Sequence, residues 1–596
     1  MLPAVLATFY ALYHGPEGLK EIAKSVQGAA NNCADLLKAA GYEVLDENYF
    51  GGFRVATSAP TNDQIEVREI DANTIALSFG EGHTIRDLST LHEALGIDAP
   101  TRTIADAPLP RTSEILSESI FVKYHTETEM MRYMARLEQR DFALNHAMIP
   151  LGSCTMKLNA AAEMAPMSWP ELMDVHPFSK KQTGGYETLM SELGEWLAQL
   201  TDLKAVSFQP NSGAQGEFAG LMAIRNYLDD NGGKERTACL IPTSAHGTNP
   251  ASAVMAGFKV VAVKCDNEGN ISLEDLKAKV EEHRDQLGAL MVTYPSTHGV
   301  FEEAIKEICE LIHEAGGQVY LDGANLNAQL CLTSPGVIGA DVCHINLHKT
   351  FCIPHGGGGP GSGPIPVAAH LAPYLPTNPE DEGSVAISSA PFGNGSINAI
   401  SWMYIAMMGG EGLKQSTRYA ILSANYLANR LEEHFPVVYK GAQGRVAHEC
   451  IIDIRDINAN TGVSAEDIAK RLIDYGFHAP TLSWPITNTL MIEPTESESK
   501  EELDRFVDSL IAIRKEITAI ENGEIDYEQS PLKLAPHPSQ DLLGAEWTRA
   551  YSREYAAFPL PDLKFNKRWP YVSRIDNVAG DRNPICSCDP ALLHED

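Results

Sequence analysis

Apolar segments of strand length recur between residues 201 and 367, and helical sequence separates them. Stretches such as Leu273–Gln286 and Ala304–Ala315 have the character of these intervening helices. Buried strands that alternate with helices of about 10–15 residues are typical of a mostly parallel sheet covered on both faces. Ligands of such sheets bind beyond the carboxyl ends of the strands, so residues that follow a strand are the first candidates for chemistry. The predicted strands are Thr237–Pro242, Val260–Cys265, Ala289–Pro295, Gln318–Asp322 and Val342–Leu347.

The sequence on either side of this sheet predicts further domains. Near the start of the chain a helix, Leu19–Ala40, precedes short strand-like runs. Towards the end, a strand at Glu449–Arg455 is followed by helices at Ser464–Tyr475 and Lys500–Ile520. The segment 104–120 contains Pro, Ser and Thr and is the best candidate boundary between the first small domain and the large sheet domain. We expect a small α+β domain at 1–103, a connector at 104–120, the large sheet domain at 121–415, a smaller α+β domain at 416–525 and a surface-wrapping tail at 526–596.

The balance of charges and cysteines restricts the class of protein. Lys and Arg number 46 against 79 Asp and Glu, which gives a net charge of −33. Such a surface repels phosphate backbones and anionic lipid, so nucleic acid and membrane are poor partners. No stretch of about 18 apolar residues is present, so we expect no membrane span. The 11 cysteines are scattered, with no C-x-x-C pair, which favours reduced thiols in a reducing compartment.

The first residues are apolar but follow no basic region, so we expect no signal or transit peptide. The predicted location is the cytoplasm, or the mitochondrial matrix if the source is eukaryotic. No spacing of His, Cys, Asp and Glu indicates a metal site. Cys154, Cys352, Cys586 and Cys588 are interpreted as buried or incidental thiols rather than nucleophiles.

A lysine, Lys349, follows the last predicted strand. Desolvation at a strand end lowers the pKa of an amine and makes it a nucleophile towards carbonyl groups. An aspartate, Asp322, ends the preceding strand, where its carboxylate could pair with a pyridinium nitrogen. Taken singly, a loop lysine is more often a surface residue and a strand-end aspartate is more often a helix cap. Together they are what a site for pyridoxal 5'-phosphate (PLP) requires.

Four further motifs follow predicted strands or precede a helix. Small residues in 211–216 precede a helical run and form a plausible phosphate cradle, although such residues are more often a simple cap. His246 could stack on a planar cofactor, or be a structural histidine in a turn. Thr297 could contact a cofactor or the substrate. The glycine run Gly356–Gly359 is either a flexible linker or a loop that lets the backbone approach a ligand.

This order of cradle, histidine, aspartate and lysine resembles the fold-type-I PLP enzymes. Several longer segments resemble, more specifically, the P-protein of the glycine cleavage system. The resemblance extends from about Phe121 to the end of the chain. The segments that carry it are Met148–Asn159, Ser207–Glu217, Ser244–Ser252 and His348–Gly361, with the shorter Tyr124–Glu129, His176–Phe178 with Gln182, and Gly580–Arg582.

The resemblance implies an α/β fold of type I, with a mostly parallel large domain and a smaller α+β domain, and PLP as the cofactor. It implies that Lys349 forms the covalent link to PLP and that Asp322 holds the pyridinium nitrogen. The implied phosphate cradle is Ser212, Gly213, Ala214 and Gln215, with His246 stacked on the ring and Thr297, Asn325 and His348 lining the site.

The implied activity is decarboxylation of glycine with transfer of the aminomethyl group to the lipoyl group of an H-protein. The family pattern has two homologous halves, in one chain or in two subunits. Residues 1–100 resemble only the end of the first half. We therefore expect a truncated chain or a separate first-half partner, and a homo-oligomer or a pairing with that partner. The alternatives are a non-catalytic or partner-dependent subunit, and another fold-type-I enzyme such as an aminotransferase or a desulfurase.

Overall fold

The computed structural model describes residues 2–62, 65–101, 103–106, 108–109, 111–179, 183–355 and 361–583. These residues form two compact units, which we describe separately. The first contains residues up to 137 together with 168–190, and the second contains 138–167, 191–355 and 361–583. Residues 121–137 thus group with the front of the chain by compactness, and the domain bounds given above stay a prediction. No helix in the described ranges is long and apolar enough to cross a membrane.

The first unit is a small antiparallel sheet packed on helices. Its strands lie in the order β1-β2-β4-β3. Side chains such as Leu37, Phe53 and Ile75 form its core. The first helix is broken at Gly15, where φ is 64° and an added Cβ would lie 2.6 Å from the Phe121 carbonyl oxygen, so only glycine fits. The elements are α1 (Leu2–Ala39), β1 (Glu43–Val44), β2 (Gly52–Ala56), β3 (Arg68–Asp71), β4 (Thr74–Ser78), α2 (Ile85–Leu95) and α3 (Glu127–Glu138).

The second unit contains a seven-stranded sheet in the order β5-β11-β10-β9-β8-β6-β7. Strands β6 to β10 pair in parallel, and β11 pairs antiparallel with both β10 and β5. The sequence prediction of a mostly parallel α/β sheet is therefore confirmed. The strands are β5 (Ala205–Ser207), β6 (Ala238–Pro242), β7 (Lys259–Val263), β8 (Leu287–Thr293), β9 (Gln318–Gly323), β10 (Val342–Ile345) and β11 (Ile365–Val367).

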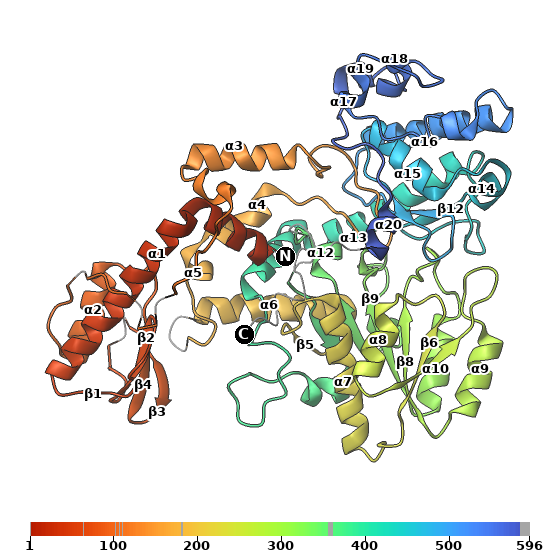
Figure 1. The fold of residues 1–596 in the computed structure, drawn as a ribbon. Coiled ribbons are helices and arrows are strands. Elements are labelled where there is room, and N and C mark those ends of the chain that lie inside the picture. The colour runs from red at the N-terminus through yellow and green to blue at the C-terminus, as the bar shows by residue number, and fades with distance from the viewer. Residues whose placement is uncertain are drawn as a thin grey trace. The chain divides into compact units, whose positions relative to one another are not determined.

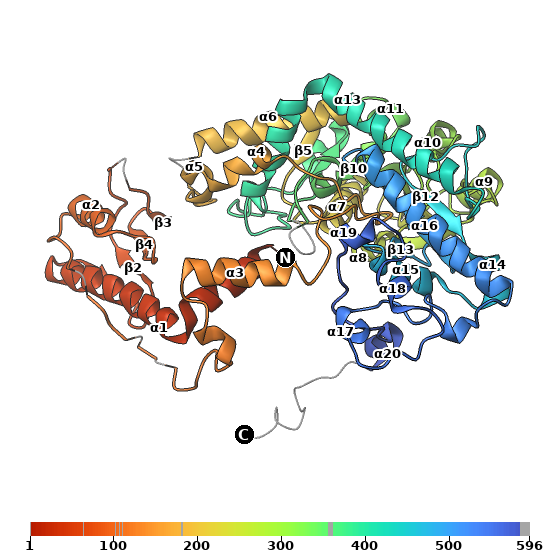
Figure 2. The ribbon, with the colours of Figure 1, turned by 90° about the horizontal axis from the view of Figure 1, so that it is seen from above.

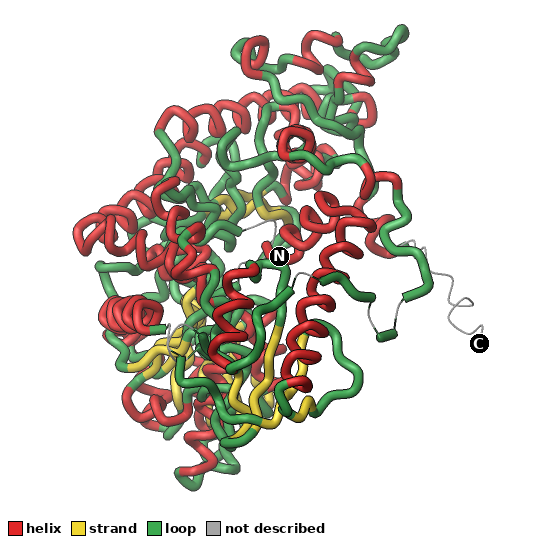
Figure 3. Tube along the Cα trace, turned by 90° about the vertical axis from the view of Figure 1, so that its left-hand side faces the viewer, coloured by secondary structure: helices red, strands yellow, loops and turns green. Residues whose placement is uncertain are grey.

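Helices cover both faces of this sheet (Figure 1). Leu240 and Leu321 belong to the core shared with α9 and α10, whereas Ile241 and Tyr320 belong to the core shared with α7 and α8. Successive residues of one strand thus enter opposite layers, as the two-residue period of a strand requires. Figure 3 shows the strands in yellow and the helices in red. These helices are α7 (Gly213–Asp230), α8 (Thr248–Met255), α9 (Leu273–Glu282) and α10 (Ile305–Glu314), and shorter ones in the second unit are α4 (Ala161–Met164), α11 (Pro335–Ile338) and α12 (Leu347–Thr350). By residue number α5 (Pro170–Met173) belongs to the first unit, and α6 (Gly184–Thr201) begins in the first unit and ends in the second.

A three-stranded antiparallel sheet, in the order β12-β14-β13, forms a smaller part of the second unit. Its apolar core includes Phe435, Ile452 and Leu510. The long helices α13 and α16 lie side by side across it (Figure 2). The elements are α13 (Asn398–Leu431), β12 (Cys450–Asp453), α14 (Arg455–Thr461), α15 (Ala465–Asp474), β13 (Thr481–Leu482), β14 (Thr489–Ile492) and α16 (Lys500–Glu521).

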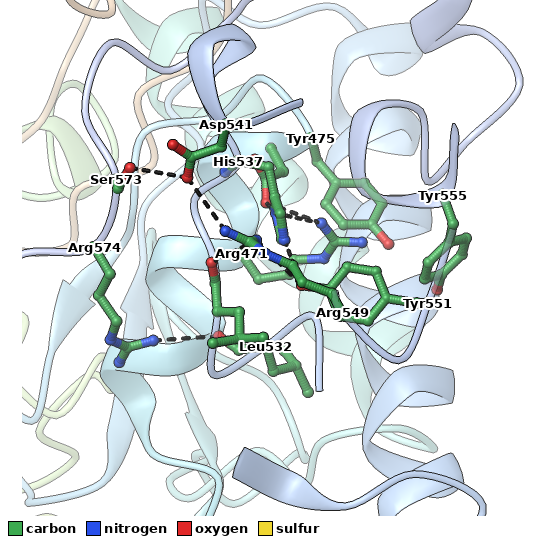
Figure 4. Close-up of polar contacts among 12 residues, drawn as sticks. Arg471, Tyr475, Leu532, His537, Asp541, Arg549, Tyr551, Tyr555, Ser573 and Arg574 are labelled. Atoms are coloured by element: carbon green, nitrogen blue, oxygen red, sulfur yellow. Dashed lines mark hydrogen bonds and ion pairs between the residues drawn. The ribbon is translucent and has the colours of Figure 1, made fainter. Parts of the chain in front are cut away.

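The chain after α16 is fastened to α15 and α16 by buried polar groups (Figure 4). Arg471 is fully buried and its guanidinium lies 2.9 Å from Asp474 and 2.7 Å from Glu516. His537 adds a contact of 2.6 Å to Asp474, and its other ring nitrogen lies 2.7 Å from the Tyr551 hydroxyl. A buried guanidinium needs such paired carboxylates. The short helices of this segment are α17 (Ser539–Leu542), α18 (Arg553–Ala557), α19 (Leu563–Asn566) and α20 (Asn577–Arg582).

Candidate active site

Lys349 lies on α12, a single helical turn that begins two residues after β10 ends. The predicted strand Val342–Leu347 therefore stops at Ile345, and Leu347 already belongs to the turn. The lysine is buried, with 8% of its surface exposed. Its Nζ donates a hydrogen bond of 2.8 Å to the Ser153 carbonyl oxygen. The amine is thus held at the carboxyl edge of the sheet, where the sequence places it.

Asp322 lies near the end of β9 and is buried. Its Oδ1 accepts the Ala324 backbone N–H at 2.9 Å and its Oδ2 accepts the Asn249 amide at 3.1 Å. Burial by itself raises the pKa of this carboxyl group, but His344 and the hydrogen bonds from Ala324 and Asn249 outweigh burial and hold the pKa below its ordinary value. Asp322 is therefore an ionised carboxylate at neutral pH.

His344, which sequence reasoning missed, supports Asp322 from the adjacent strand. The two residues are paired in register between β9 and β10, and His344 Nε2 lies 3.3 Å from Asp322 Oδ1. The Tyr320 hydroxyl lies 2.9 Å from His344 Nδ1. Because an ionised carboxylate only accepts, Nε2 carries a proton that faces Asp322. The signal for this group was a polar histidine inside an otherwise apolar strand.

The predicted phosphate cradle is the start of α7, a helix of 18 residues. Ser212 caps this helix, and its Oγ accepts the Gln215 backbone N–H at 3.1 Å. Gln215 Oε1 in turn accepts the Asn211 N–H at 2.7 Å. Ala214 is exposed, and an added Cβ on Gly213 would lie 2.5 Å from Asn346 Oδ1. The helix start thus offers an anion its dipole and lies against the loop that leads to α12.

His246 lies in the turn between β6 and α8 and is exposed. Its Nδ1 is 3.0 Å from the Thr248 hydroxyl, and its ring contacts Trp484 edge-on at a centroid distance of 5.5 Å. The Thr248 hydroxyl donates to Glu217 at 2.8 Å. The imidazole is therefore oriented by its neighbours while it remains open to a ligand.

Thr297 and Asn325 are buried and bind backbone groups of neighbouring strand-end loops. The Thr297 hydroxyl donates to the Ser244 carbonyl oxygen, and the Asn325 amide donates to the Pro295 carbonyl oxygen at 3.0 Å. Both fix the loops that form the site. His348 is half-buried beside Lys349. Burial, followed by Lys349 and neighbouring histidines, lowers its pKa to about 2, so this imidazole is neutral.

Comparison with known proteins identifies the relatives of this chain. Models for the glycine cleavage system P-protein and for the C-terminal domain of glycine dehydrogenase match residues 1–95 and 416–537. Between them, a model for β-eliminating lyases matches residues 182–450. A glycine dehydrogenase (decarboxylating) from Photobacterium profundum is 54% identical over 98% of this chain. Over nearly its whole length the chain is thus similar to glycine dehydrogenases (decarboxylating). Relatives of the same name from Nostoc punctiforme and Vibrio cholerae are 51% and 53% identical over 99% and 100% of the chain.

The chain spans 64–65% of the length of these P-protein relatives. Solved structures agree on the fold. An inhibitor-bound glycine decarboxylase (P-protein) superimposes with a TM-score of 0.54 at 18% identity, covering 72% of this chain and 98% of that one. A sphingosine-1-phosphate lyase from Burkholderia pseudomallei gives 0.53 at 15% identity, covering 70% and 95%. At these identities the structural likeness shows the fold alone, a fold-type-I α/β architecture.

Several residues named in the sequence analysis fall outside the described residues. Gly356–Gly359, Gln182, Cys586 and Cys588 all lie there. Just after the glycine run, an added Cβ on Gly363 would lie 2.2 Å from the Ser212 carbonyl oxygen, so the backbone here passes directly against the start of α7. Burial raises the pKa of Cys352 to about 12 and also raises the pKa of Cys154. Both thiols are therefore protonated, in keeping with their interpretation as non-nucleophilic.

The candidate site contains buried polar atoms that have no hydrogen-bond partner in the described part of the chain. They cluster at the start of α7, after β6 and around α12. Buried polar groups in native proteins are normally hydrogen-bonded, so these atoms mark a place built for a polar ligand. They are Asn211 Oδ1, Asn249 Oδ1, Asn346 Oδ1, His348 Nδ1 and Thr350 Oγ1.

Proposed function

We propose that this chain performs the glycine-decarboxylating reaction of the P-protein family, with PLP as cofactor. Glycine loses CO2, and the remaining aminomethyl group passes to the lipoyl group of an H-protein. The observation that carries the proposal is the pairing of a buried lysine, Lys349, with an ionised aspartate, Asp322, at the ends of adjacent parallel strands. The relatives that match the whole length of the chain bear the name of this activity.

The residues present fit PLP. Its phosphate suits the start of α7, where backbone N–H groups such as those of Gly213 and Ala214 lie at a helix N-terminus. The exposed face of His246 suits stacking on the pyridine ring. Asp322 suits the ring nitrogen, because its carboxylate is kept ionised by His344. When bound, PLP supplies an electron sink for the breaking C–CO2 bond.

In this proposal each side chain has a defined task. Lys349 binds the cofactor through its amine, Asp322 holds a proton on the ring nitrogen, and His344 orients Asp322. Thr297 and Asn325 keep the loops after β6, β8 and β9 together. His348 is neutral and therefore brings no positive charge to the lysine beside it.

The proposed partners are glycine, a lipoylated H-protein, and either a second copy of the chain or a first-half P-protein subunit. Apolar side chains on α1 and α3 support the assembly, because Leu6 and Met131 are each 58% exposed. Large exposed apolar patches are unusual on a monomer. The proposed location is the cytoplasm, and nine free cysteines among the described residues are compatible with a reducing compartment there.

Exchange of labelled bicarbonate into glycine, measured with PLP and lipoylated H-protein, tests this function. We expect exchange only when both PLP and lipoylated H-protein are present. A parallel reaction also contains a first-half subunit. Transfer of an amino group from glutamate, or release of sulfur from cysteine, identifies an aminotransferase or a desulfurase instead. PLP binding without any exchange, even with the first-half subunit present, contradicts the proposed activity.

A further inference from the structure

A group of buried titratable residues from the small sheet lies within electrostatic reach of Lys349. His448 and Glu449 immediately precede β12, and Glu493 immediately follows β14. These two strands pair antiparallel, with Cys450 opposite Ile492, so the three residues meet at one end of the small sheet. One side-chain ligand atom from each lies within 4.8 Å of the others. At most 1% of any of the three is exposed.

The two glutamates are only half satisfied by hydrogen bonds. Glu449 Oε2 accepts the Ser153 backbone N–H at 2.7 Å. Glu493 Oε1 accepts the Thr155 hydroxyl and, at 3.2 Å, the Asn327 amide. Among the described residues no hydrogen-bond partner reaches Glu449 Oε1, Glu493 Oε2 or either ring nitrogen of His448, although His448 Nε2 lies 3.9 Å from Glu493 Oε1. Two buried carboxylates this close cannot both remain charged without cost, and one proton relieves that repulsion.

Ser153 connects this acid pair with the lysine. Its backbone N–H binds Glu449, and its carbonyl oxygen accepts the hydrogen bond from Lys349 Nζ at 2.8 Å. Lys349 also acts electrostatically on both carboxyl groups, and on His448. The pair and the amine are therefore one electrostatic unit that joins the small sheet to the end of β10.

The charges around the pair favour one negative charge. Burial and Lys349 lower the pKa of His448 to about 3, so this imidazole is neutral. Burial likewise keeps the nearby Cys154 thiol protonated. One lysine ammonium balances one carboxylate, which leaves the other to hold a proton. Burial raises the pKa of Glu449 to about 7, and burial together with Glu449 raises that of Glu493 to about 8.

We propose that Glu449 and Glu493 share a single proton at neutral pH and act as positioning residues that set the charge state of the Lys349 amine. The proposal rests on the role given to Lys349 under the proposed function. As pH rises, the shared proton leaves for solvent and a second negative charge appears near the lysine. This charge stabilises the ammonium form, which is unreactive towards a carbonyl carbon. The pair titrates as a unit, so neither glutamate has a separate value.

Infrared spectroscopy of the PLP-loaded protein tests the shared proton directly. The measurement is the carbonyl stretch of protonated carboxyl groups, compared between the parent and the double variant Glu449→Gln with Glu493→Gln. We expect the parent at pH 7 to show one more protonated carboxyl per chain, and this signal to fade as pH is raised towards 9. Equal signals in the two proteins at pH 7 overturn the proposal.

The reaction of Lys349 with PLP gives a second readout, measured as the rate of borohydride-trapped adduct at each pH. Without the pair the ammonium loses its negative neighbour, so we expect the profile of the double variant to move to lower pH by about 1–2 units. Glu302→Gln is the matched control, since Glu302 is equally buried but binds the backbone of Ile271 and Ala304. The control profile should coincide with that of the parent.

An unchanged profile in the double variant overturns the proposal even if the protein binds PLP and decarboxylates glycine. Conversely, PLP trapped on another lysine refutes the proposed function, whereas the infrared result still reports on the acid pair. Circular dichroism and thermal unfolding of each variant show that the fold is kept, and the parent's infrared titration needs no variant. Elemental analysis completes the set, because a stoichiometric metal lost in the double variant shows that a cation occupies the place of the proton.

Discussion

Asp322 and His344 occupy paired positions on the parallel strands β9 and β10, with their side chains in contact on one face of the sheet. Tyr320, two residues before Asp322, reaches the other nitrogen of the same imidazole. Two neighbouring strands thus place a phenol, an imidazole and a carboxylate in line towards the carboxyl edge. Strand register alone brings these three side chains together. We expect the effect of substitution to be largest at Asp322, smaller at His344 and smallest at Tyr320.

His344→Leu should leave Asp322 less able to hold the proton on the ring nitrogen of PLP. Without the imidazole the pKa of Asp322 rises, because burial is then opposed by fewer groups. We expect the visible absorbance of bound PLP to become pH-dependent in the neutral range and glycine exchange to fall about tenfold. Tyr320→Phe should cost only about 1 kcal/mol of stability and leave that absorbance intact. A pH-independent spectrum for His344→Leu contradicts this role.

Lys349→Ala should purify folded but colourless, or with PLP that borohydride does not fix. The reason is that Lys349 is the buried amine at the strand-end edge. Lys157 offers a matched control, since it is also buried and forms an ion pair with Glu496. Lys157→Met should destabilise the protein yet keep the trapped cofactor. Mass spectrometry of the reduced protein locates the adduct, and an adduct in Lys349→Ala at full stoichiometry refutes the assignment.

Asp322→Asn should still bind PLP but lose most of its rate. A neutral amide cannot hold the proton on the ring nitrogen, so the electron sink is lost. By analogy with other preorganised charges we expect a fall of about 100-fold or more in bicarbonate exchange. The check is the exchange rate at saturating glycine, with bound PLP quantified in parallel. Rates within a few-fold of the parent would show that another group protonates the ring.

Acid should weaken the attachment of the C-terminal segment. Burial raises the pKa of Asp474, but His537 and Arg471 outweigh it and lower the pKa to about 2. A lowered value means that stability is present above the unfolded value near 4 and is lost as pH falls towards 2. The loss is about 2 kcal/mol. Unfolding measured between pH 5 and 2 should show this for the parent, whereas Asp474→Asn should be less stable at pH 7 and change less over that range.

Self-association should follow from the apolar side chains exposed on the first unit. We expect light scattering to report a dimer or larger species, with weak or no glycine decarboxylation until a first-half subunit is added. Leu6→Glu and Met131→Glu should shift the population towards monomer, because both place a charge on an exposed apolar face. Lys20→Glu, a change at an already polar position, should have no such effect. A monomer with full activity alone contradicts the expectation.

The sheet was predictable because its strands are unbroken apolar runs. Each of the five predicted strands exists, with ends displaced by only one or two residues. The candidate cradle, Asp322 and Lys349 could be proposed because helix starts and strand ends are where ligands bind. His448, Glu449 and Glu493 could not be, since they flank strands of a different sheet, and nothing in the local sequence shows that β12 and β14 bring them together near Lys349. Tyr320 and His344 were also missed, because they lie inside apolar strands rather than after them, and a single polar residue there does not by itself indicate a site.

The fastening of the last segment has a consequence for biosynthesis. Arg471 and Asp474 leave the ribosome well before His537 and Lys567, although all four meet in the finished protein. Until those later residues emerge, the Arg471 guanidinium and the Asp474 carboxylate, which are buried in the finished protein, lack some of their interaction partners. The small domain therefore cannot complete its folding during the synthesis of its own strands and helices. Its maturation is timed by the arrival of the segment that closes over it.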